Sequence, residues 1–251
     1  MAWSKKDGKR SPIRKPLMPQ AGDSLAARFE DVAMDRMLFP MMLAGVFVVL
    51  AALEWHREIR DTKPSPRTMT VIAAGTVAYA VWRVRRTIRE LRDLKIARDG
   101  ERAVAQRLES DLRSRGYEIF HDIPADGFNI DHLVIGPTGV FVVETKTRRK
   151  PNHGSPHVIY DGKRVTVDGW EPDRNPVAQA RAISQWLRDQ IRDSTDRTFP
   201  IRPIVVFPGW FVEPGPPGAE VWVLNDKAAV SFIVGARNQM DAQDRALVAD
   251  C

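Results

Sequence analysis

The stretch Asn129-Ile-Asp-His-Leu-Val-Ile-Gly-Pro-Thr-Gly-Val-Phe-Val-Val-Glu-Thr-Lys146 contains two apolar runs separated by a Gly-Pro-Thr-Gly segment at 136–139. Apolar runs on either side of a short Gly/Pro segment predict a β-hairpin. Asp131 lies five residues before the first glycine of the turn, and Glu144 lies five residues after the last. Because antiparallel pairing brings residues equidistant from the turn together, we expect the two carboxylates to be close neighbours.

Lys146 follows Glu144 by two residues and is expected on the same face of the strand, because strand side chains alternate. Two carboxylates and one ammonium group at a strand end suit a divalent metal ion and a phosphodiester, so the hairpin predicts a nuclease site. The alternative is a solvated sheet face with one ion pair. Both runs are largely apolar, as in a sheet covered on both faces, and facing carboxylates destabilise a sheet unless they are neutralised. The metal site is therefore the favoured interpretation.

The composition bounds the class of protein. At 251 residues with 43% hydrophobic content, the chain can form one good-sized domain and an appendage. Its sole cysteine, Cys251, excludes a disulfide framework and a cysteine-based zinc site. The net charge of +6 is concentrated in residues 1–99, which hold 19 Lys/Arg against 11 Asp/Glu; residues 100–251 hold 19 against 21. The basic character is therefore no indication that the C-terminal part binds nucleic acid.

Two apolar segments explain the N-terminal region. Residues 37–53 contain no charge, and residues 66–82 contain only Arg67. A bilayer core is crossed by about 17 to 25 helical residues, and aromatic residues stand near the ends of both segments, as at headgroups. We expect a transmembrane hairpin over residues 37–82; the alternative is a buried helical pair in a soluble protein. A cleavable signal peptide would begin nearer the N-terminus.

Basic residues predict the orientation of this hairpin. Eight lie in residues 1–36 and seven in residues 83–98, whereas the connecting region 54–67 contains four. Lys and Arg are enriched in cytoplasmic segments, so we expect a multi-pass protein of the cell membrane with both termini and the C-terminal domain in the cytoplasm. The segment 83–98 would also favour anionic headgroups; a solvated helix face remains compatible with that role.

The remaining pattern is that of an α/β domain with a mixed sheet. The sequence first predicts a helix over 83–99 interrupted at Asp99-Gly100, a second helix from Glu101 to Gly116, and a strand over 117–123. The hairpin described above follows, and then a smaller hairpin over 157–160 and 164–167. The last predicted elements are a helix from Pro176 to about Arg192 capped by Asn175, strands over 201–207 and 221–224, and a helix capped by Asn225 or Asp226 that ends near Ala236.

Several of these motifs resemble a known family. Asp99-Gly100-Glu101 at a helix start, the 129–146 stretch and Asn175-Pro176-Val-Ala-Gln179-Ala are similar to the nuclease-related domain (NERD) family of the PD-(D/E)XK restriction-endonuclease-like superfamily. The resemblance covers about residues 98–236. It implies a restriction-endonuclease-like mixed central sheet flanked by helices. It also implies Asp131, Glu144 and Lys146 as the core site, with Glu101 and Gln179 as helix-borne supports.

The expected division of the chain follows. It comprises a basic cytoplasmic tail (1–36), two transmembrane helices (37–82), a juxtamembrane helix (83–98), the nuclease-related domain (99–237) and a flexible tail (238–251).

The candidate site suits Mg²⁺, or Mn²⁺, because hard cations take carboxylate oxygens and keep several waters. Asp131 and Glu144 would bind it, and Glu101 would bind a second metal or a metal-bound water; an ordinary acid at a helix N-terminus is the alternative for Glu101. Lys146 would orient the attacking water or neutralise developing charge. Gln179 would hydrogen-bond Lys146 or a phosphate, or would be an ordinary helix residue.

The expected function is therefore a membrane-anchored, metal-dependent nuclease that hydrolyses phosphodiester bonds of nucleic acid, with DNA as the expected partner. The alternative is a non-catalytic, membrane-tethered nucleic-acid-binding or scaffold module with a vestigial site. Arg148, Arg149 and Lys150 would contact phosphates or form a solvated run. His132 alternates away from Asp131 and is expected in the core or on the sheet face rather than on a metal.

Overall fold

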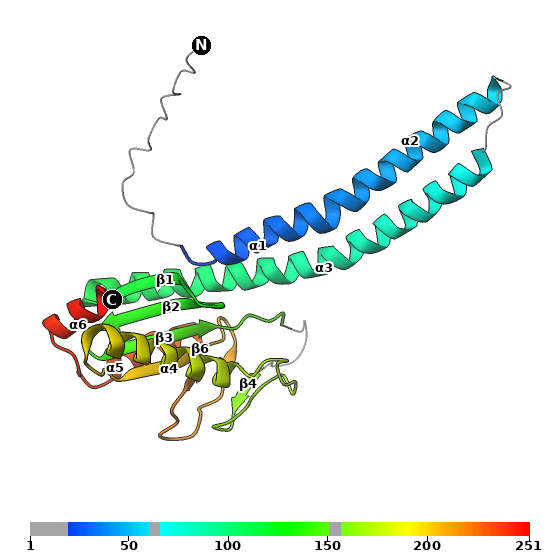
Figure 1. Ribbon diagram of the computed structural model, residues 1–251. Coiled ribbons are helices and arrows are strands. Elements are labelled where there is room, and N and C mark those ends of the chain that lie inside the picture. Colours follow the sequence, from blue (N-terminus) through cyan, green and yellow to red (C-terminus); the bar gives the residue numbers. More distant parts are fainter. Residues whose placement is uncertain (1–19, 61–65, 151–156) are drawn as a thin grey trace, which may run out of the picture.

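The computed structural model describes residues 20–60, 66–150 and 157–251. A helical hairpin leads into the α/β part of the chain (Figure 1). Its first arm is α1 (Asp23–Ala33), a π-helical turn (Met34–Leu38) and α2 (Phe39–Ile59). Its second arm is the long helix α3 (Pro66–Leu112). The predicted apolar segments 37–53 and 66–82 lie within these two arms.

The hairpin buries small side chains and exposes large ones. On α3 the buried positions in this region recur every seven residues, and Ala44 and Ala51 are buried on α2 with the same spacing; those of α3 are Pro66, Ala73, Ala80 and Thr87. A seven-residue repeat keeps one face of each helix towards its neighbour, and small residues let helices approach closely. Large apolar side chains of both arms are exposed.

One helical segment of the described residues, Asp23–Ile59, is long and apolar enough to cross a membrane by length and composition. The same measure does not select the beginning of α3. The second of the two expected membrane spans therefore stays a prediction.

Helix α3 corrects the expected interruption at Asp99-Gly100, because it runs through both residues without a break. A Cβ atom added at Gly100 would lie 1.8 Å from Cγ2 of Thr147. The glycine therefore allows the helix to approach the end of a strand rather than terminating the helix. The predicted stop at Gly116 is confirmed: a 3₁₀ turn follows Leu112, and Gly116 adopts a left-handed conformation with φ 81°.

A five-stranded mixed sheet forms the centre of the α/β part, with strand order β1-β2-β3-β6-β8. Strands β1 (Glu118–Ala125), β2 (Phe128–Gly136) and β3 (Gly139–Thr145) are antiparallel, whereas β6 (Ile201–Val206) and β8 (Trp222–Leu224) continue in parallel. The β2–β3 register pairs Gly136 with Gly139. The predicted hairpin is thus confirmed.

Helices cover both faces of this sheet, which confirms the expected α/β class (Figure 1). The C-terminal part of α3 and helix α5 (Asp226–Gly235) pack on one face, where Leu108 and Ile233 contact the core. Helices α4 (Pro176–Thr195) and α6 (Ala242–Ala249) pack on the other. The apolar content of the central strands follows from this double coverage.

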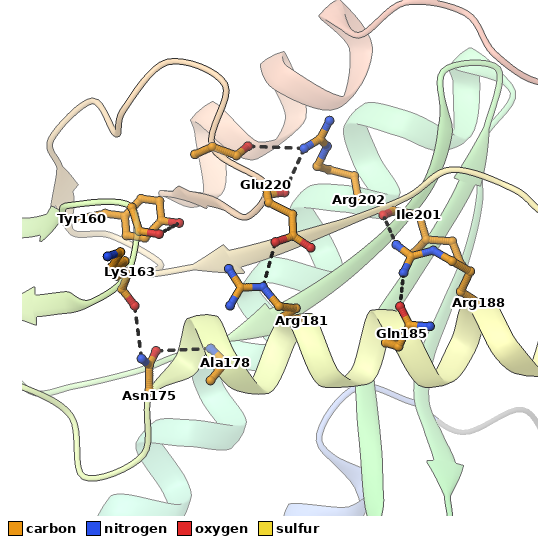
Figure 2. Close-up of polar contacts among 12 residues, drawn as sticks. Tyr160, Lys163, Asn175, Ala178, Arg181, Gln185, Arg188, Ile201, Arg202 and Glu220 are labelled. Carbon is orange, nitrogen blue, oxygen red and sulfur yellow. Dashed lines mark hydrogen bonds and ion pairs between the residues drawn. The ribbon is translucent and has the colours of Figure 1, made fainter.

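Helix α4 begins where its sequence predicts. The side-chain oxygen of Asn175 accepts hydrogen bonds from the backbone N–H groups of Val177 and Ala178 (3.0 and 3.3 Å), and Pro176 occupies the first turn. Figure 2 shows this cap and two arginines that tie α4 to the neighbouring strand region. Arg181 pairs with Glu220, and Arg188 donates to the carbonyl of Ile201, which opens β6. These contacts fix where α4 runs over the sheet.

A second, smaller sheet has the order β5-β4-β7. Strands β4 (His157–Tyr160) and β5 (Val165–Val167) confirm the predicted smaller hairpin, and β7 (Phe211–Val212) was not expected. The C-terminus also differs from expectation: residues 238–251 contain α6 instead of a flexible tail. Met240 and Val248 are buried in the core beside β2, and this burial holds the short helix in place.

Candidate active site

Asp131 and Glu144 lie on neighbouring strands, as the hairpin predicts. The β2–β3 register pairs His132 with Val143, so the next step along the ladder brings Asp131 to Glu144. The backbone N–H of Thr145 donates to Oδ2 of Asp131 at 2.7 Å. Both acids therefore lie where β3 ends.

Glu144 is held by two side chains from different elements. Its Oε1 atom accepts hydrogen bonds from Nζ of Lys146 and from Nε2 of Gln179, each at 2.7 Å. Nζ of Lys146 also donates to Oε1 of Gln179 at 3.0 Å, which closes a triangle. Lys146 directly follows β3, and Gln179 lies in the first turn of α4. The sequence-predicted Glu144, Lys146 and Gln179 are thus in direct contact.

The second oxygen of the Glu144 carboxylate has a different environment from the first. Oε2 of Glu144 is buried and has no hydrogen-bond partner among the described residues, and the whole residue is only 3% exposed. A buried, unpartnered carboxylate oxygen costs free energy because it has lost its hydration. The site therefore holds an acceptor that is available to a ligand.

Glu101 reaches the same region from α3. Burial, followed by the negative charges of Asp122 and Glu144, raises the pKa of Glu101 to about 7, although Lys146 acts in the opposite direction. Burial and then the charges of Glu144 and Glu101 raise the pKa of Asp131 well above its ordinary value; the hydrogen bond from Thr145 offsets this only in part. The three predicted acids thus repel one another, and a bound cation would relieve that repulsion.

Asp122 is a further buried acid that the sequence reading missed. It lies in β1 between two register pairs, His121–His132 and Ile123–Ile130, and so beside the position of Asp131. Its backbone has φ 48°, in the left-handed region that Asp tolerates better than most residues. The sequence signal that pointed to it is an acid between His121 and the apolar Ile123 within the strand.

Two hydrogen bonds hold the Asp122 carboxylate. Oδ2 accepts from the backbone N–H of Ser24 at 2.6 Å, and Oδ1 accepts from Nδ2 of Asn129 at 2.8 Å. Ser24 belongs to the first turn of α1, where free N–H groups favour an anion. The first arm of the helical hairpin therefore contacts an acid next to the candidate site.

His132 is fully buried, as expected for a histidine that points away from Asp131. Its Nε2 lies 3.2 Å from Oγ1 of Thr145, and its Nδ1 lies 2.9 Å from Nδ1 of His121. Burial, and then the neighbouring His121, lower the pKa of His132 to about 3, so the ring is neutral. His132 supports Thr145, whose backbone holds Asp131.

The donor set fits a hard divalent cation in part. Within residues 20–60, 66–150 and 157–251, no group of three or more His, Cys, Asp or Glu residues is placed to hold a metal ion. Mg²⁺ needs only one or two carboxylates in addition to waters and a substrate phosphate. Asp131 and the unpartnered oxygen of Glu144 supply that chemistry.

Part of the chain matches a known protein family. Residues 96–208 match the family model described as NERD, nuclease-related domain. That range contains all five predicted site residues. No curated protein matches the chain.

One solved structure is similar over part of the chain: the structure of Pyrococcus furiosus SfsA in complex with Ca²⁺. The identity is 17%, the match covers 50% of this chain and 53% of that chain, and the TM-score is 0.28. The chain spans about half the length of that protein. A TM-score of this size carries no argument about shared architecture or function.

Proposed function

We propose that the protein is a membrane-anchored, metal-dependent nuclease that hydrolyses phosphodiester bonds of nucleic acid. The observation that carries this proposal is the Glu144 carboxylate. One of its oxygens is bound by Lys146 and Gln179, while the other, beside Asp131, is buried and has no partner within residues 20–60, 66–150 and 157–251. The match of residues 96–208 to a nuclease-related domain supports the same chemistry.

Asp131, Glu144 and Glu101 are the residues that would hold Mg²⁺ or Mn²⁺. A cation bound there would supply Lewis-acid stabilisation of a phosphoryl oxygen and a water of lowered pKa. Lys146 would stabilise negative charge that develops on the phosphate, because its ammonium group already lies at the carboxylate edge of the site. Gln179 would hold the side chains of Lys146 and Glu144 in position through its two hydrogen bonds. The expected substrate is DNA.

The helical hairpin would anchor the enzyme in the cell membrane as a multi-pass protein. The large apolar side chains exposed on both arms support this, as do the small residues buried between them. The basic residues that flank the hairpin support a cytoplasmic position of both termini and of the α/β domain.

A second candidate is a non-catalytic, membrane-tethered module that binds nucleic acid or acts as a scaffold. One observation favours it: the described part of the chain lacks a group of three potential ligands placed for a metal ion. In that case the Lys146–Glu144–Gln179 triangle would be a structural ion pair rather than part of a reactive site.

A cleavage assay separates these two functions. Full-length protein in detergent would be incubated with DNA and RNA, single- and double-stranded, with Mg²⁺ or Mn²⁺. Asp131→Asn should abolish cleavage because it removes a charged ligand, whereas Lys146→Ala should slow cleavage by about 10² to 10³ because a transition-state donor is lost. If wild type cleaves none of these substrates, the scaffold function is favoured. If Asp131→Asn cleaves as fast as wild type, the site is misassigned.

A further inference from the structure

Three consecutive basic residues, Arg148, Arg149 and Lys150, follow the candidate site, and each is held by a different element. The Arg148 guanidinium lies 3.4 Å from the ring centroid of Trp170. Nη2 of Arg149 lies 3.0 Å from a carboxylate oxygen of Asp93 on α3. Lys150 donates to the carbonyl of Gly209. Fixed positions of this kind differ from those of a freely solvated charge run.

Two of these cations keep an uncompensated charge. Arg148 stacks on an aromatic ring, and Lys150 contacts a neutral carbonyl and lies 5.6 Å from the ring centroid of Trp210. Neither forms an ion pair with an acid in the part of the chain that the structure describes. A cation on a ring face or a carbonyl is positioned without being neutralised, so both remain available to phosphate.

Their position is adjacent to the candidate site. Arg148 lies two residues beyond Lys146, whose backbone N–H donates to the carbonyl of Val206 at 2.8 Å. Gly209, the partner of Lys150, follows Val206 at the end of β6. The carboxyl ends of the parallel strands β3 and β6 therefore lead directly into this surface, and ligands of α/β sheets bind at such ends.

Trp170 adds an aromatic surface. It ends a tight turn in which Asp168 and Gly169 both have positive φ (52° and 77°), and the residue is 41% exposed. The chain then continues to the N-terminus of α4, which carries Gln179. A half-exposed tryptophan with a guanidinium stacked on it is a suitable platform for an unpaired base.

We propose that Arg148, Lys150 and Trp170 bind a single-stranded segment of nucleic acid beside the cleavage site. Arg148 and Lys150 contact phosphates, and one base stacks on Trp170. The single-stranded form follows because a base in a duplex has both faces covered by its neighbours. The inference rests on the proposed function in taking nucleic acid as the partner.

Binding without turnover tests this surface. Full-length protein carrying Glu144→Gln, in detergent and without divalent metal, would be titrated with labelled oligo(dT) and with a duplex. Trp170→Leu should weaken oligo(dT) binding about 5- to 150-fold, the range of one base–aromatic stack, and leave duplex binding nearly unchanged. Trp170→Phe, which retains a ring, should restore most of the affinity.

The salt dependence tests the cations separately. Arg148→Gln should reduce the slope of log K against log salt by about 0.7 for single strands. The control is Arg192→Gln, which removes the same charge from an exposed position near the far end of α4, where Arg192 pairs with Asp189. Its slope should match that of the parent protein.

The outcomes are separable from those of the cleavage assay. The inference is wrong if the Glu144→Gln parent does not bind oligo(dT), if Trp170→Leu weakens single strand and duplex equally or not at all, or if Arg148→Gln behaves like Arg192→Gln. A wild type that binds as described but cleaves nothing would refute the proposed nuclease and leave the binding surface supported.

Discussion

The two halves of α3 bury opposite kinds of side chain. In the first half the small residues Ala73 and Ala80 face α2, whereas Val71 and Trp82 are 72% and 54% exposed. In the second half Leu108 is 1% exposed and packs on the central sheet. A helix in water buries its large apolar side chains. The first half inverts this pattern, and this difference supports the proposed membrane anchor.

The change occurs within one continuous helix, and Glu101 lies in its second half. One continuous helix therefore connects the apolar hairpin to a candidate catalytic acid. A second connection is the hydrogen bond from Ser24 of α1 to Asp122. If the hairpin is an anchor, the site is held at a fixed distance from the membrane surface.

The largest expected effect concerns the proposed anchoring of the first half of α3 in a membrane. Full-length protein should remain in the membrane fraction after extraction with carbonate or high salt, because the exposed apolar side chains of both arms would otherwise meet water. A reporter fused to the C-terminus should lie in the cytoplasm. Release by carbonate would refute the anchor, and an external reporter would refute the orientation alone.

A smaller expected effect concerns Glu101 in the second half of α3, and it appears in the pH dependence of the free energy of unfolding. Its pKa is raised from 4.5 to about 7 in the folded protein. A raised pKa gives a stability contribution that is complete below the unfolded value of 4.5 and is lost as the pH rises through 7. Without metal, Glu101→Gln should therefore be more stable than wild type above pH 7, by on the order of 3 kcal/mol, and similar to it near pH 4.5.

Chemical denaturation across this pH range, in the presence of a chelator, measures the difference. Glu118→Gln, at an exposed position on β1, is the control and should leave the profile unchanged. A difference between Glu101→Gln and wild type that is independent of pH would show that the pKa of Glu101 is not raised in the folded protein.

The smallest expected effect compares two glycines of α3. Alanine is favoured over glycine in a helix by about 1 kcal/mol, and a Cβ atom at Gly75 would meet nothing within 4 Å. Gly75→Ala should therefore be neutral or stabilising. Gly100→Ala should instead destabilise by about 1–3 kcal/mol, because the methyl group collides with Thr147 beside Lys146. Melting temperatures in detergent measure the stability change of both variants. Equal changes would contradict a collision between a methyl group at position 100 and Thr147.

Local sequence signals predicted the hairpin and the α4 cap well. Both depend on residues that are close in sequence: two apolar runs about a Gly-Pro turn, and Asn175 followed by Pro176. The hairpin register alone brought Asp131 to Glu144. The family resemblance implied Gln179 as a support of the site, with Lys146 or a phosphate as its expected partner. Its contact with Glu144, 35 residues away along the chain, was not predicted.

Other features depended on distant contacts and were missed. Gly100 has a low helix propensity, yet packing against Thr147 requires it within the helix. Asp122 gains its role from Ser24, which is 98 residues away. Helix α6 is short, and the burial of Met240 and Val248 and the ion pair between Arg197 and Asp244 hold it against the sheet. Local propensity cannot anticipate such tertiary contacts.

The central claim is that Glu144 and Asp131 form a cation site, and the most direct test is the melting temperature of the full-length protein with and without Mg²⁺. Binding to the folded state alone stabilises by about 2.7 kcal/mol at a metal concentration 100 times the Kd. Wild type and Lys146→Ala should both show a clear rise, whereas Glu144→Gln, which removes the charge of the buried carboxylate, should show none. No rise in wild type, or an equal rise in Glu144→Gln, would contradict the account.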